Sequence, residues 1–273
     1  MNQLTPLLEE FDRAGRSETC PVIDMHGHYG HWYAFHFPHP EAEGMLRDMD
    51  RCGVRLAVCS HHAAFRDPAR GNALLREAVQ AHPDRFRGYW VVHPHYTETL
   101  EAELAALTEA EEFVGVKVHP GMNNYPLEGD RYRPVFEWAE ATGRPVLSHT
   151  WTGGLCSAAN VRAVAERHPR ATLIMGHSIA GEFEAAIGLA REHPNLYLEL
   201  TGVTRTHGLI EWMVREAGAD KILFGEDLPW FDPHWGMGAV LWSRISDEDR
   251  HAILHGNAER LLKQAGCDLP PWP

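Results

Sequence analysis

The sequence lacks features that would point to whole classes of protein. No run of 18 or more apolar residues occurs, so no segment could cross a bilayer as a helix. The first residues, MNQLTPLLEEFDRAG, are polar and acidic, unlike a signal or transit peptide. Lysine and arginine number 25 against 38 acidic residues, which gives a net charge of −13, and no basic cluster stands out. We therefore expect neither membrane nor nucleic-acid binding.

Cysteine is scarce, and its pattern excludes a disulfide framework. The five cysteines are scattered, odd in number and free of any C-x-x-C motif. Such a pattern is typical of reduced thiols in a cytoplasmic protein, and this is the location we expect.

What the sequence does contain is a regular alternation of short apolar runs and amphipathic stretches. The expected strands are residues 21–26, 55–60, 86–94, 114–120, 145–150, 172–178, 196–201 and 221–227. Eight strands alternating with helices predict an α/β fold, a parallel sheet closed as a (β/α)₈ TIM barrel. A doubly wound open sheet is the alternative, but MHGHYGHW after the first strand is a poor phosphate loop.

No low-complexity linker or charge block divides the chain, so we predict a single domain over residues 1–273. Residues 1–19 are expected to form an extension whose helix closes the bottom of the barrel, and residues 20–265 the barrel itself. The stretch SDEDRHAILHGNAERLLKQAG is expected to be the last helix, with Ser246 as its N-cap.

Polar side chains gather at the expected strand ends, where barrels of this type carry their active sites. These residues are His26, His28, Lys117, His119, His149, His177 and Asp227. His26 and His28 are two residues apart, so they face the same side of their strand and can reach one cation. Imidazole with carboxylate is a ligand set for zinc, iron or manganese. His31 follows in an aromatic loop, and we do not expect it to be a ligand.

In these motifs the sequence resembles the amidohydrolase superfamily. The resemblance is to the amidohydrolase-related branch, which includes aminocarboxymuconate-semialdehyde decarboxylase and many uncharacterised metal-dependent hydrolases. It covers nearly the whole chain, through VIDMHGHYG, GVKVHPGMNNYPLEGDRYRPVFEWAEATGRPVLSHT, TLIMGHS, KILFGED and HGNAERLL. It implies that His26, His28, His149 and Asp227 bind one divalent metal, which we expect to be zinc, with manganese or iron as alternatives.

Two positions bear on the number of metals and on the family pattern. In some branches of the superfamily a carboxylated lysine bridges two metals, and Lys117 with His177 would then serve a second one. In the branch resembled here this lysine often has no such role, so we favour an ion pair in the barrel mouth and a single metal. Glu226 stands where the family usually has serine, and it is expected to face outward with little effect on the chemistry.

The expected function is hydrolysis of an amide, ester or lactone bond of a small molecule. A bound divalent metal lowers the pKa of its water from about 15.7 to near 7. Asp227 would act as general base, and His177 would hydrogen-bond the water or polarise the carbonyl. His119, Trp32 and Trp151 are expected to contact the substrate, with Arg205 as a clamp for a carboxylate.

Three alternatives to the hydrolase remain. Non-oxidative decarboxylation of a small aromatic or dienoic acid would use the same metal site; it ranks second because such decarboxylases are generally longer chains. A metal-dependent deoxyribonuclease is disfavoured by Lys117, where a glutamate ligand is expected, and by the net charge of −13. A catalytically silent binding barrel is disfavoured by the complete set of metal-site residues. A homodimer is the ordinary expectation for a soluble enzyme.

Overall fold

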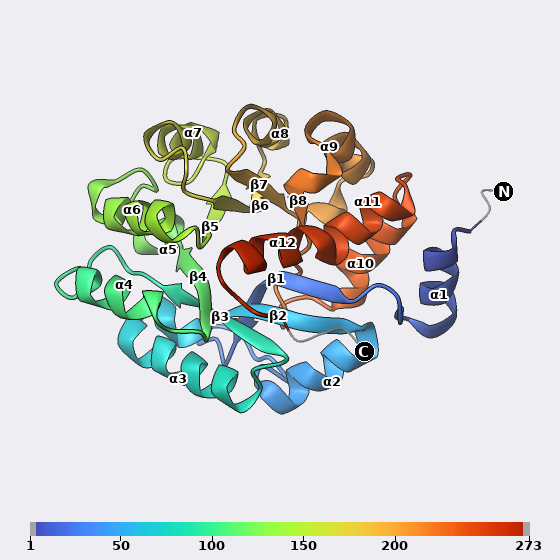
Figure 1. Cartoon of the computed structure of the whole chain (residues 1–273), viewed down its shortest axis with the longest axis horizontal. Helices are drawn as coiled ribbons and strands as arrows, with labels where there is room; N and C mark the ends of the chain where they lie inside the picture. Colours follow the sequence, from blue (N-terminus) through green and yellow to red (C-terminus); the bar gives the residue numbers. More distant parts are fainter. Residues whose placement is uncertain (1–3, 270–273) are drawn as a thin grey trace.

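Eight parallel strands follow one another in chain order around the computed structural model of the protein (Figure 1). They are β1 (Val22–Tyr29), β2 (Val54–His61), β3 (Phe86–Val91), β4 (Phe113–Val118), β5 (Val146–Trp151), β6 (Leu173–Ala180), β7 (Leu196–Glu199) and β8 (Ile222–Leu223). The structure describes residues 4–269, so residues 1–3 and 270–273 of the predicted domain lie outside it. The predicted TIM barrel is confirmed.

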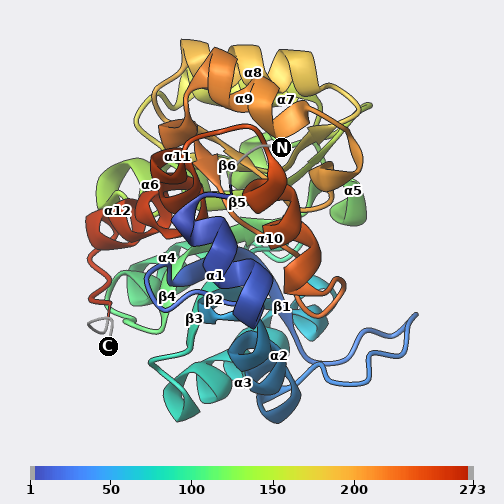
Figure 2. The ribbon, with the colours of Figure 1, turned by 90° about the vertical axis from the view of Figure 1, so that its right-hand side faces the viewer.

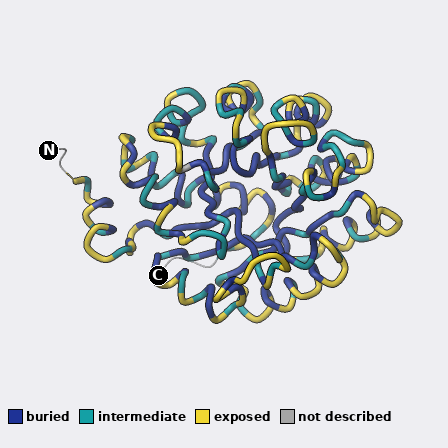
Figure 3. Tube along the Cα trace, turned by 180° about the vertical axis from the view of Figure 1, so that it is seen from behind, coloured by how far each residue is buried: buried dark blue, intermediate teal, exposed yellow. Residues whose placement is uncertain are grey.

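Helices surround the strands and form the outer layer (Figures 1 and 2). They are α1 (Pro6–Ala14), α2 (Ala42–Cys52), α3 (Pro68–Ala81), α4 (Leu100–Thr108), α5 (Pro120–Asn123), α6 (Arg133–Thr142), α7 (Ala158–Arg167), α8 (Phe183–Glu192), α9 (Leu209–Ala217), α10 (Pro233–Trp242), α11 (Asp247–His251) and α12 (Asn257–Gln264). A π-helical turn, η5 (Ala252–Gly256), joins α11 to α12 and divides the predicted last helix. The tube in Figure 3 is buried along the strands and exposed along the outer faces of the helices.

Local sequence signals explain where several helices begin and end. The Asp67 side chain accepts a hydrogen bond from a backbone N–H of the first turn of α3, and Pro68 occupies the first helical position. Gly53 ends α2 with a φ of 76°, a left-handed conformation that favours glycine. Ser246 caps α11 as predicted, in a reciprocal capping box with Asp249.

The barrel closes where β1 meets the segment that follows β8. Regular strand geometry ends at Leu223, earlier than the predicted strand 221–227, but the backbone beyond it still bonds to β1. The bonds are Met25 N to Phe224 O (3.0 Å), Asp227 N to His26 O (2.8 Å) and His28 N to Leu228 O (2.6 Å). This seam, residues 22–29 with 224–228, brings the two ends of the barrel sequence together.

The inside of the barrel is filled by side chains from the strands and is covered at one end by α12. This inner cluster consists of Ile23, Met25, Leu56, Val58, Tyr89, Val114, Leu147, Ile174 and Leu223 with Ala258, Leu261 and Leu262. The last three belong to α12, which lies across the centre of the ring in Figure 1. The prediction that the N-terminal helix closes the bottom is therefore corrected: the closing helix is α12.

Helix α1 instead packs on the flank of the barrel, where its apolar side chains join the outer cluster between strands and helices. The carbonyl of Gly15, at its end, accepts a hydrogen bond from His234 of α10 (2.7 Å). Arg16 donates to the carbonyl of Asp50 in α2 (3.2 Å). Figure 2 shows α1 beside these two helices.

Two expectations drawn from composition can be compared with the structure. Among residues 4–269, no helix combines the length and the apolar character needed to span a membrane. All five cysteines are free thiols, and four of them are buried.

Candidate active site

His26, His28 and Asp227 come together at the seam of the barrel. His26 and His28 lie on β1, and Asp227 lies just beyond β8. One donor atom from each of the three residues lies within 4.8 Å of the others. The structure therefore brings the two same-facing histidines of β1 together with Asp227 in one cluster.

The chemistry of this cluster fits a cation. Asp227 Oδ1 lies 3.0 Å from His28 Nε2 and 3.4 Å from His26 Nε2. It is buried, yet it accepts no hydrogen bond of good geometry. Donors about 2.0–2.2 Å from one metal ion lie roughly 3–3.5 Å apart, so the spacing matches a shared ligand sphere. Burial alone would raise the pKa of Asp227, but His26 and His28 outweigh it and the pKa lies well below its usual value.

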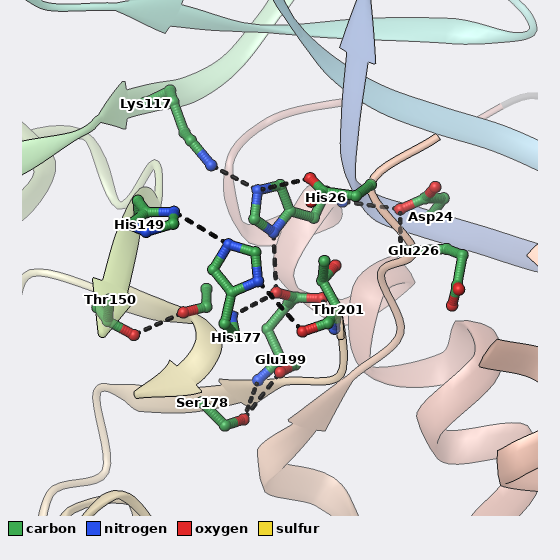
Figure 4. A network of polar contacts seen from close by, with 12 residues as sticks. Asp24, His26, Lys117, His149, Thr150, His177, Ser178, Glu199, Thr201 and Glu226 are labelled. Atoms are coloured by element: carbon green, nitrogen blue, oxygen red, sulfur yellow. Dashed lines mark hydrogen bonds and ion pairs between the residues drawn. The ribbon is translucent and has the colours of Figure 1, made fainter. Parts of the chain in front are cut away.

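A buried carboxylate orients His26. Glu199 Oε2 accepts a hydrogen bond from His26 Nδ1 (2.8 Å), so the Nε2 lone pair faces Asp227 (Figure 4). Glu199 also accepts from the backbone N–H groups of His177 (2.9 Å) and Thr201 (2.6 Å). His28 is held in the same way by Ser60, whose Oγ lies 3.1 Å from its Nδ1. Such partners fix the ring orientation that a metal ligand needs.

Lys117 lies inside the barrel with its ammonium group against this cluster. Its Nζ is 2.6 Å from His26 Nε2, and the residue is 1% exposed. Burial lowers the pKa of Lys117 to about 8, while Asp227 and Glu199 oppose that shift. Lys117 thus has carboxylates as electrostatic partners in the barrel mouth, and the ion pair expected in preference to carboxylation stays a prediction.

Three histidines from neighbouring strands form a chain beside the cluster. His177 Nδ1 donates to the carbonyl of Thr201 (3.2 Å), so its Nε2 accepts from His149 Nδ1 (3.0 Å). His149 stacks on His119 with ring centroids 3.9 Å apart. Burial lowers the pKa of His177 to about 4, which keeps it neutral at pH 7. His149 lies outside the three-donor group, and its role as a fourth ligand stays a prediction.

The backbone is strained at two of these positions. His177, Ser178 and Ile179 have φ values of 63°, 47° and 51°, and Asp227 has 63°. Residues other than glycine seldom adopt this left-handed conformation, and such strain gathers at functional sites. At His177 the observed hydrogen bond of its backbone N–H to Glu199 holds the strained segment.

The donor cluster opens into a cavity of about 250 Å³. Its lining is His28, Trp32, His62, Phe65, Lys117, His119, Met122, His149, His177, Asp227 and Trp230. Two of the predicted substrate contacts, Trp32 and His119, are therefore in the lining. The volume lies just below the usual range for ligand pockets, roughly 300–1,000 Å³, which suits a compound no larger than a single ring.

His62 is a pocket residue that the sequence reading missed. It lies in a short 3₁₀ turn after β2 and stacks on His28 at 4.8 Å between ring centroids. Its Nδ1 donates to the carbonyl of Gly30, and its Nε2 accepts from Trp230 Nε1 (3.0 Å). Burial lowers the pKa of His62 to about 3, so it stays neutral. The sequence signal was a second histidine directly after the strand RLAVCSH.

The structure does not bring the other two predicted substrate contacts into the cavity lining. Trp151 is 48% exposed and stacks on His149 from outside the cavity, with centroids 5.9 Å apart. The Arg205 guanidinium lies over Phe231 and Trp235, at 5.9 and 5.7 Å from their ring centroids. Among the described residues that line the cavity, Lys117 is the cationic side chain and none is an arginine.

Glu226 faces away from the barrel interior, as predicted, but it is buried rather than solvated. It is 1% exposed and lies so close to Gly236 of α10 that a Cβ added there would be 1.5 Å from its Oε2. Burial raises the pKa of Glu226 to about 10, so its carboxyl is protonated at pH 7. Its backbone N–H donates to Asp24 (3.2 Å), which also accepts from His26 N (2.9 Å).

The chain is similar to known proteins over most of its length. The chain belongs to the amidohydrolase family: the Amidohydro_2 model, described as Amidohydrolase, matches residues 23–264. The chain is thus an enzyme of the amidohydrolase superfamily, with relatives among the decarboxylases of the branch named above.

Three similar proteins illustrate the relationship. The gamma-resorcylate decarboxylase of Polaromonas sp. is 26% identical over 281 residues, covering 80% of this chain and 86% of that protein. The uncharacterised TIM-barrel protein Bb4693 of Bordetella bronchiseptica superposes with a TM-score of 0.73 at 22% identity, covering 90% and 99% of the chains. The 5-carboxyvanillate decarboxylase of Novosphingobium aromaticivorans, solved with manganese and 4-hydroxy-3-methoxy-5-nitrobenzoic acid, has a TM-score of 0.74 at 15% identity over 90% and 97%.

The expected hydrolase activity is wrong. Curated relatives with which the chain aligns are gamma-resorcylate decarboxylases, and similar solved structures include 5-carboxyvanillate and 2,6-dihydroxybenzoate decarboxylases. These findings favour the decarboxylase alternative. The length argument against it fails as well, because this chain spans 86% of the Polaromonas enzyme and 97% of the Novosphingobium enzyme.

Proposed function

We propose that the protein is a metal-dependent, non-oxidative decarboxylase of a small benzoic acid that carries a hydroxyl group next to its carboxylate. The observation that carries the proposal is the cluster of His26, His28 and Asp227, of which His28 and Asp227 line a small cavity with aromatic walls. The decarboxylases that resemble the chain are named for acids of this class, gamma-resorcylate and 5-carboxyvanillate.

His26, His28 and Asp227 would hold one divalent ion, with His149 as the predicted fourth ligand. When bound, this ion supplies Lewis-acid binding of the substrate's carboxylate and neighbouring hydroxyl oxygen. Manganese in similar structures supports Mn²⁺ over the zinc expected from the residues. The described donors at this cavity form one three-residue group, which supports a single ion.

Asp227 would transfer the proton that the reaction consumes. Replacement of the carboxylate by hydrogen needs one proton at the ring carbon and releases CO₂, with no change in oxidation state of the protein. Asp227 Oδ1 accepts no hydrogen bond of good geometry from the protein, so it can receive the proton of the substrate's hydroxyl group and pass it to that carbon. Its low pKa makes the protonated form a strong acid, which suits a weakly basic ring carbon. Solvent then reprotonates the phenolate of the product.

The remaining residues of the cavity would position the acid. Trp32, Phe65 and Trp230 offer flat apolar surfaces to the ring. His119 accepts a hydrogen bond at Nδ1 from Met122 N (3.2 Å), so its Nε2 carries a proton and can donate to a substrate oxygen. The cation of Lys117 takes the place of the clamp expected from Arg205. His177, neutral and fixed by Thr201, would hold His149 in its orientation.

Three further predictions concern the setting in which the enzyme works. The net charge of −13 supports a small-molecule substrate over nucleic acid. Free thiols support a location in the cytosol. A homodimer is proposed on general grounds only, because most soluble oligomers are symmetric homo-oligomers.

Turnover of a matched pair of acids tests the proposal. The Mn²⁺-loaded enzyme should release CO₂ from 2,6-dihydroxybenzoate or 5-carboxyvanillate, and benzoate, which lacks the hydroxyl group, should give none. Asp227→Asn should lose about 10²–10⁴-fold in kcat, the range for a proton-transfer group. Release of CO₂ from neither hydroxybenzoate, with stoichiometric metal bound, would overturn the proposal. Full turnover by Asp227→Asn would overturn the role of Asp227.

A further inference from the structure

A second group of metal-binding residues lies outside the active site. One donor atom each from Cys20, His251 and His255 lies within 4.8 Å of the others. Cys20 immediately precedes the segment that enters β1. His251 ends α11, and His255 lies within the π-helical turn η5 that follows. This turn packs against β1 and β8, so residues distant in sequence meet at the end of β1 that is farther from the cavity.

The two histidines have a spacing and orientation suited to one ion. They are four residues apart on one helical face, the spacing of paired histidine ligands in helical zinc motifs. His251 Nδ1 lies 3.1 Å from His255 Nε2, and their rings stand at 86° to each other. Ligands about 2.0 Å from a tetrahedral metal lie about 3.3 Å apart, close to the observed separation. π-helical turns are also frequent at functional sites.

A carboxylate orients one of these ligands. Glu259 Oε1 accepts a hydrogen bond from His255 Nδ1 (2.7 Å), so the Nε2 lone pair faces His251. This arrangement repeats that of Glu199 and His26 in the active site, and carboxylate–histidine–metal triads are common in proteins. The charged groups that act on the Cys20 thiol are three carboxylates, Glu10, Asp247 and Glu259. Of these carboxylates, Asp247 is already paired with Arg250 (2.7 Å).

A second group of possible metal ligands elsewhere in the fold serves as a comparison, and we call it the decoy group. Cys52, Asp232 and His234 also lie within 4.8 Å of one another. In that group, however, the Arg51 guanidinium donates to Asp232 (2.7 Å) and lies 3.1 Å from His234 Nδ1. The other ring nitrogen of His234 is bonded to the carbonyl of Gly15 (2.7 Å). A protein cation already neutralises those donors.

We propose that Cys20, His251 and His255 bind a divalent ion of the zinc class, which fastens the entry to β1 onto the helices that close the barrel. Thiolate with imidazole is a donor set that selects zinc or cobalt over manganese, magnesium or calcium. Binding replaces the S–H bond of Cys20 by a sulfur–metal bond and releases that proton to solvent; no oxidation occurs.

Cobalt substitution distinguishes this group from the active site. Co²⁺ bound by a thiolate gives a near-ultraviolet sulfur-to-metal charge-transfer band, and the described lining of the active-site cavity contains no cysteine. Full-length protein, freed of metal with a chelator, is titrated with CoCl₂. The expected result is a charge-transfer band that saturates at one equivalent and disappears when Zn²⁺ is added.

Variants assign that band to its residues. Cys20→Ser should abolish it and lower the bound zinc by one equivalent, while Cys52→Ser, the control from the decoy group, should leave it intact. If Cys20→Ser does not fold, as judged by circular dichroism, His255→Gln serves instead and should weaken Co²⁺ binding at least about tenfold. No band in the native chain, or a band that persists in Cys20→Ser, would overturn the proposal. Neither result depends on decarboxylase activity.

Discussion

The two ends of strand β1 carry donor groups of different chemistry. At its C-terminal end, His26 and His28 face Asp227 and open into a cavity with aromatic walls. Before its N-terminal end, Cys20 faces two histidines at the junction of helices α11 and α12. In both places a glutamate orients a histidine, and at the first place His28 and Asp227 also line a cavity that a substrate can enter. The difference indicates that a metal-binding group needs a lined cavity, as well as ligands, to act on a substrate. Without such a cavity, the same kinds of ligand can only stabilise the fold.

The largest effect on activity is expected when the site at the C-terminal end of β1 is lost and the Cys20 group is kept. His28→Ala should lower decarboxylation by at least about 10³-fold, because bound metal contributes several kcal/mol of charge stabilisation. The cobalt–thiolate band should stay unchanged. Metal analysis and CO₂ release measure the two sites separately, and His31→Ala, at a histidine with a 65% exposed side chain, is the control. Turnover at the native rate in His28→Ala would remove the ligand role of His28.

The two orienting glutamates should differ in importance. Glu199→Gln should weaken Mn²⁺ binding about 10–100-fold, because it removes a charged partner of His26 from a fully buried position. Glu259→Gln should weaken cobalt binding at the Cys20 group only a few-fold, since the Glu259 side chain is 32% exposed and water can replace it. Calorimetric titrations of both variants give the comparison. An equal loss of metal affinity in the two variants would show that burial of the glutamate does not set its importance.

Acid should lower the free energy of unfolding, because buried neutral histidines lie at the cavity end of the barrel. Burial lowers the pKa of His61 to about 4 and of His62 to about 3, against about 6.5 in the unfolded chain. The unfolded state therefore binds more protons below pH 6.5, and stability is lost as the pH falls from 6.5 toward those values. Between pH 7 and pH 5, each histidine should cost roughly 1–2 kcal/mol of unfolding free energy.

Urea unfolding of the metal-free protein at several pH values measures this loss. His61→Gln should reduce the loss of unfolding free energy between pH 7 and pH 5 by the contribution of one histidine. His31→Gln, whose imidazole is exposed, should leave the slope as it is. A slope that His61→Gln does not change would show that this imidazole is not kept neutral by the fold.

The smallest expected effect concerns the wall of the cavity. Trp230→Phe keeps the apolar ring but removes the hydrogen bond to His62 Nε2, a loss of about 1 kcal/mol. We expect KM to rise about threefold to tenfold with kcat little changed. Trp151→Phe, outside the cavity lining, should leave both constants as they are, and a fall in kcat for Trp230→Phe would point to a role in the chemistry.

Much of the fold followed from the alternation of apolar runs, because eight such runs between helices have few ways to bury their faces. The inward pair His26 and His28 followed from the period of a strand. Asp227 followed from its place at the end of the eighth apolar run, although regular strand geometry ends before it, at Leu223. The closing helix was misassigned because α1 and α12 both have one apolar face, and only the packed structure distinguishes their partners.

Two functional residues were out of reach for related reasons. Glu199 lies inside LYLELT, which reads as an ordinary buried strand, and its partner His26 is 173 positions away. A charge within an apolar strand was the available signal. His62 lies on a 3₁₀ turn, where neither helical nor strand period says which way a side chain faces. The left-handed backbone at His177 and Asp227 likewise depends on distant partners that no local pattern encodes.

The seam between β1 and residues 224–228 has a consequence for biosynthesis. A ribosome-bound chain that ends before residue 224 contains His26 and His28 but not Asp227, and its barrel is still open. Active-site metal capture therefore has to wait until nearly the whole polypeptide has emerged and its first strand has met its last. The same contact that completes the barrel would also complete the proposed ligand set, so bound metal would show that synthesis and closure had finished.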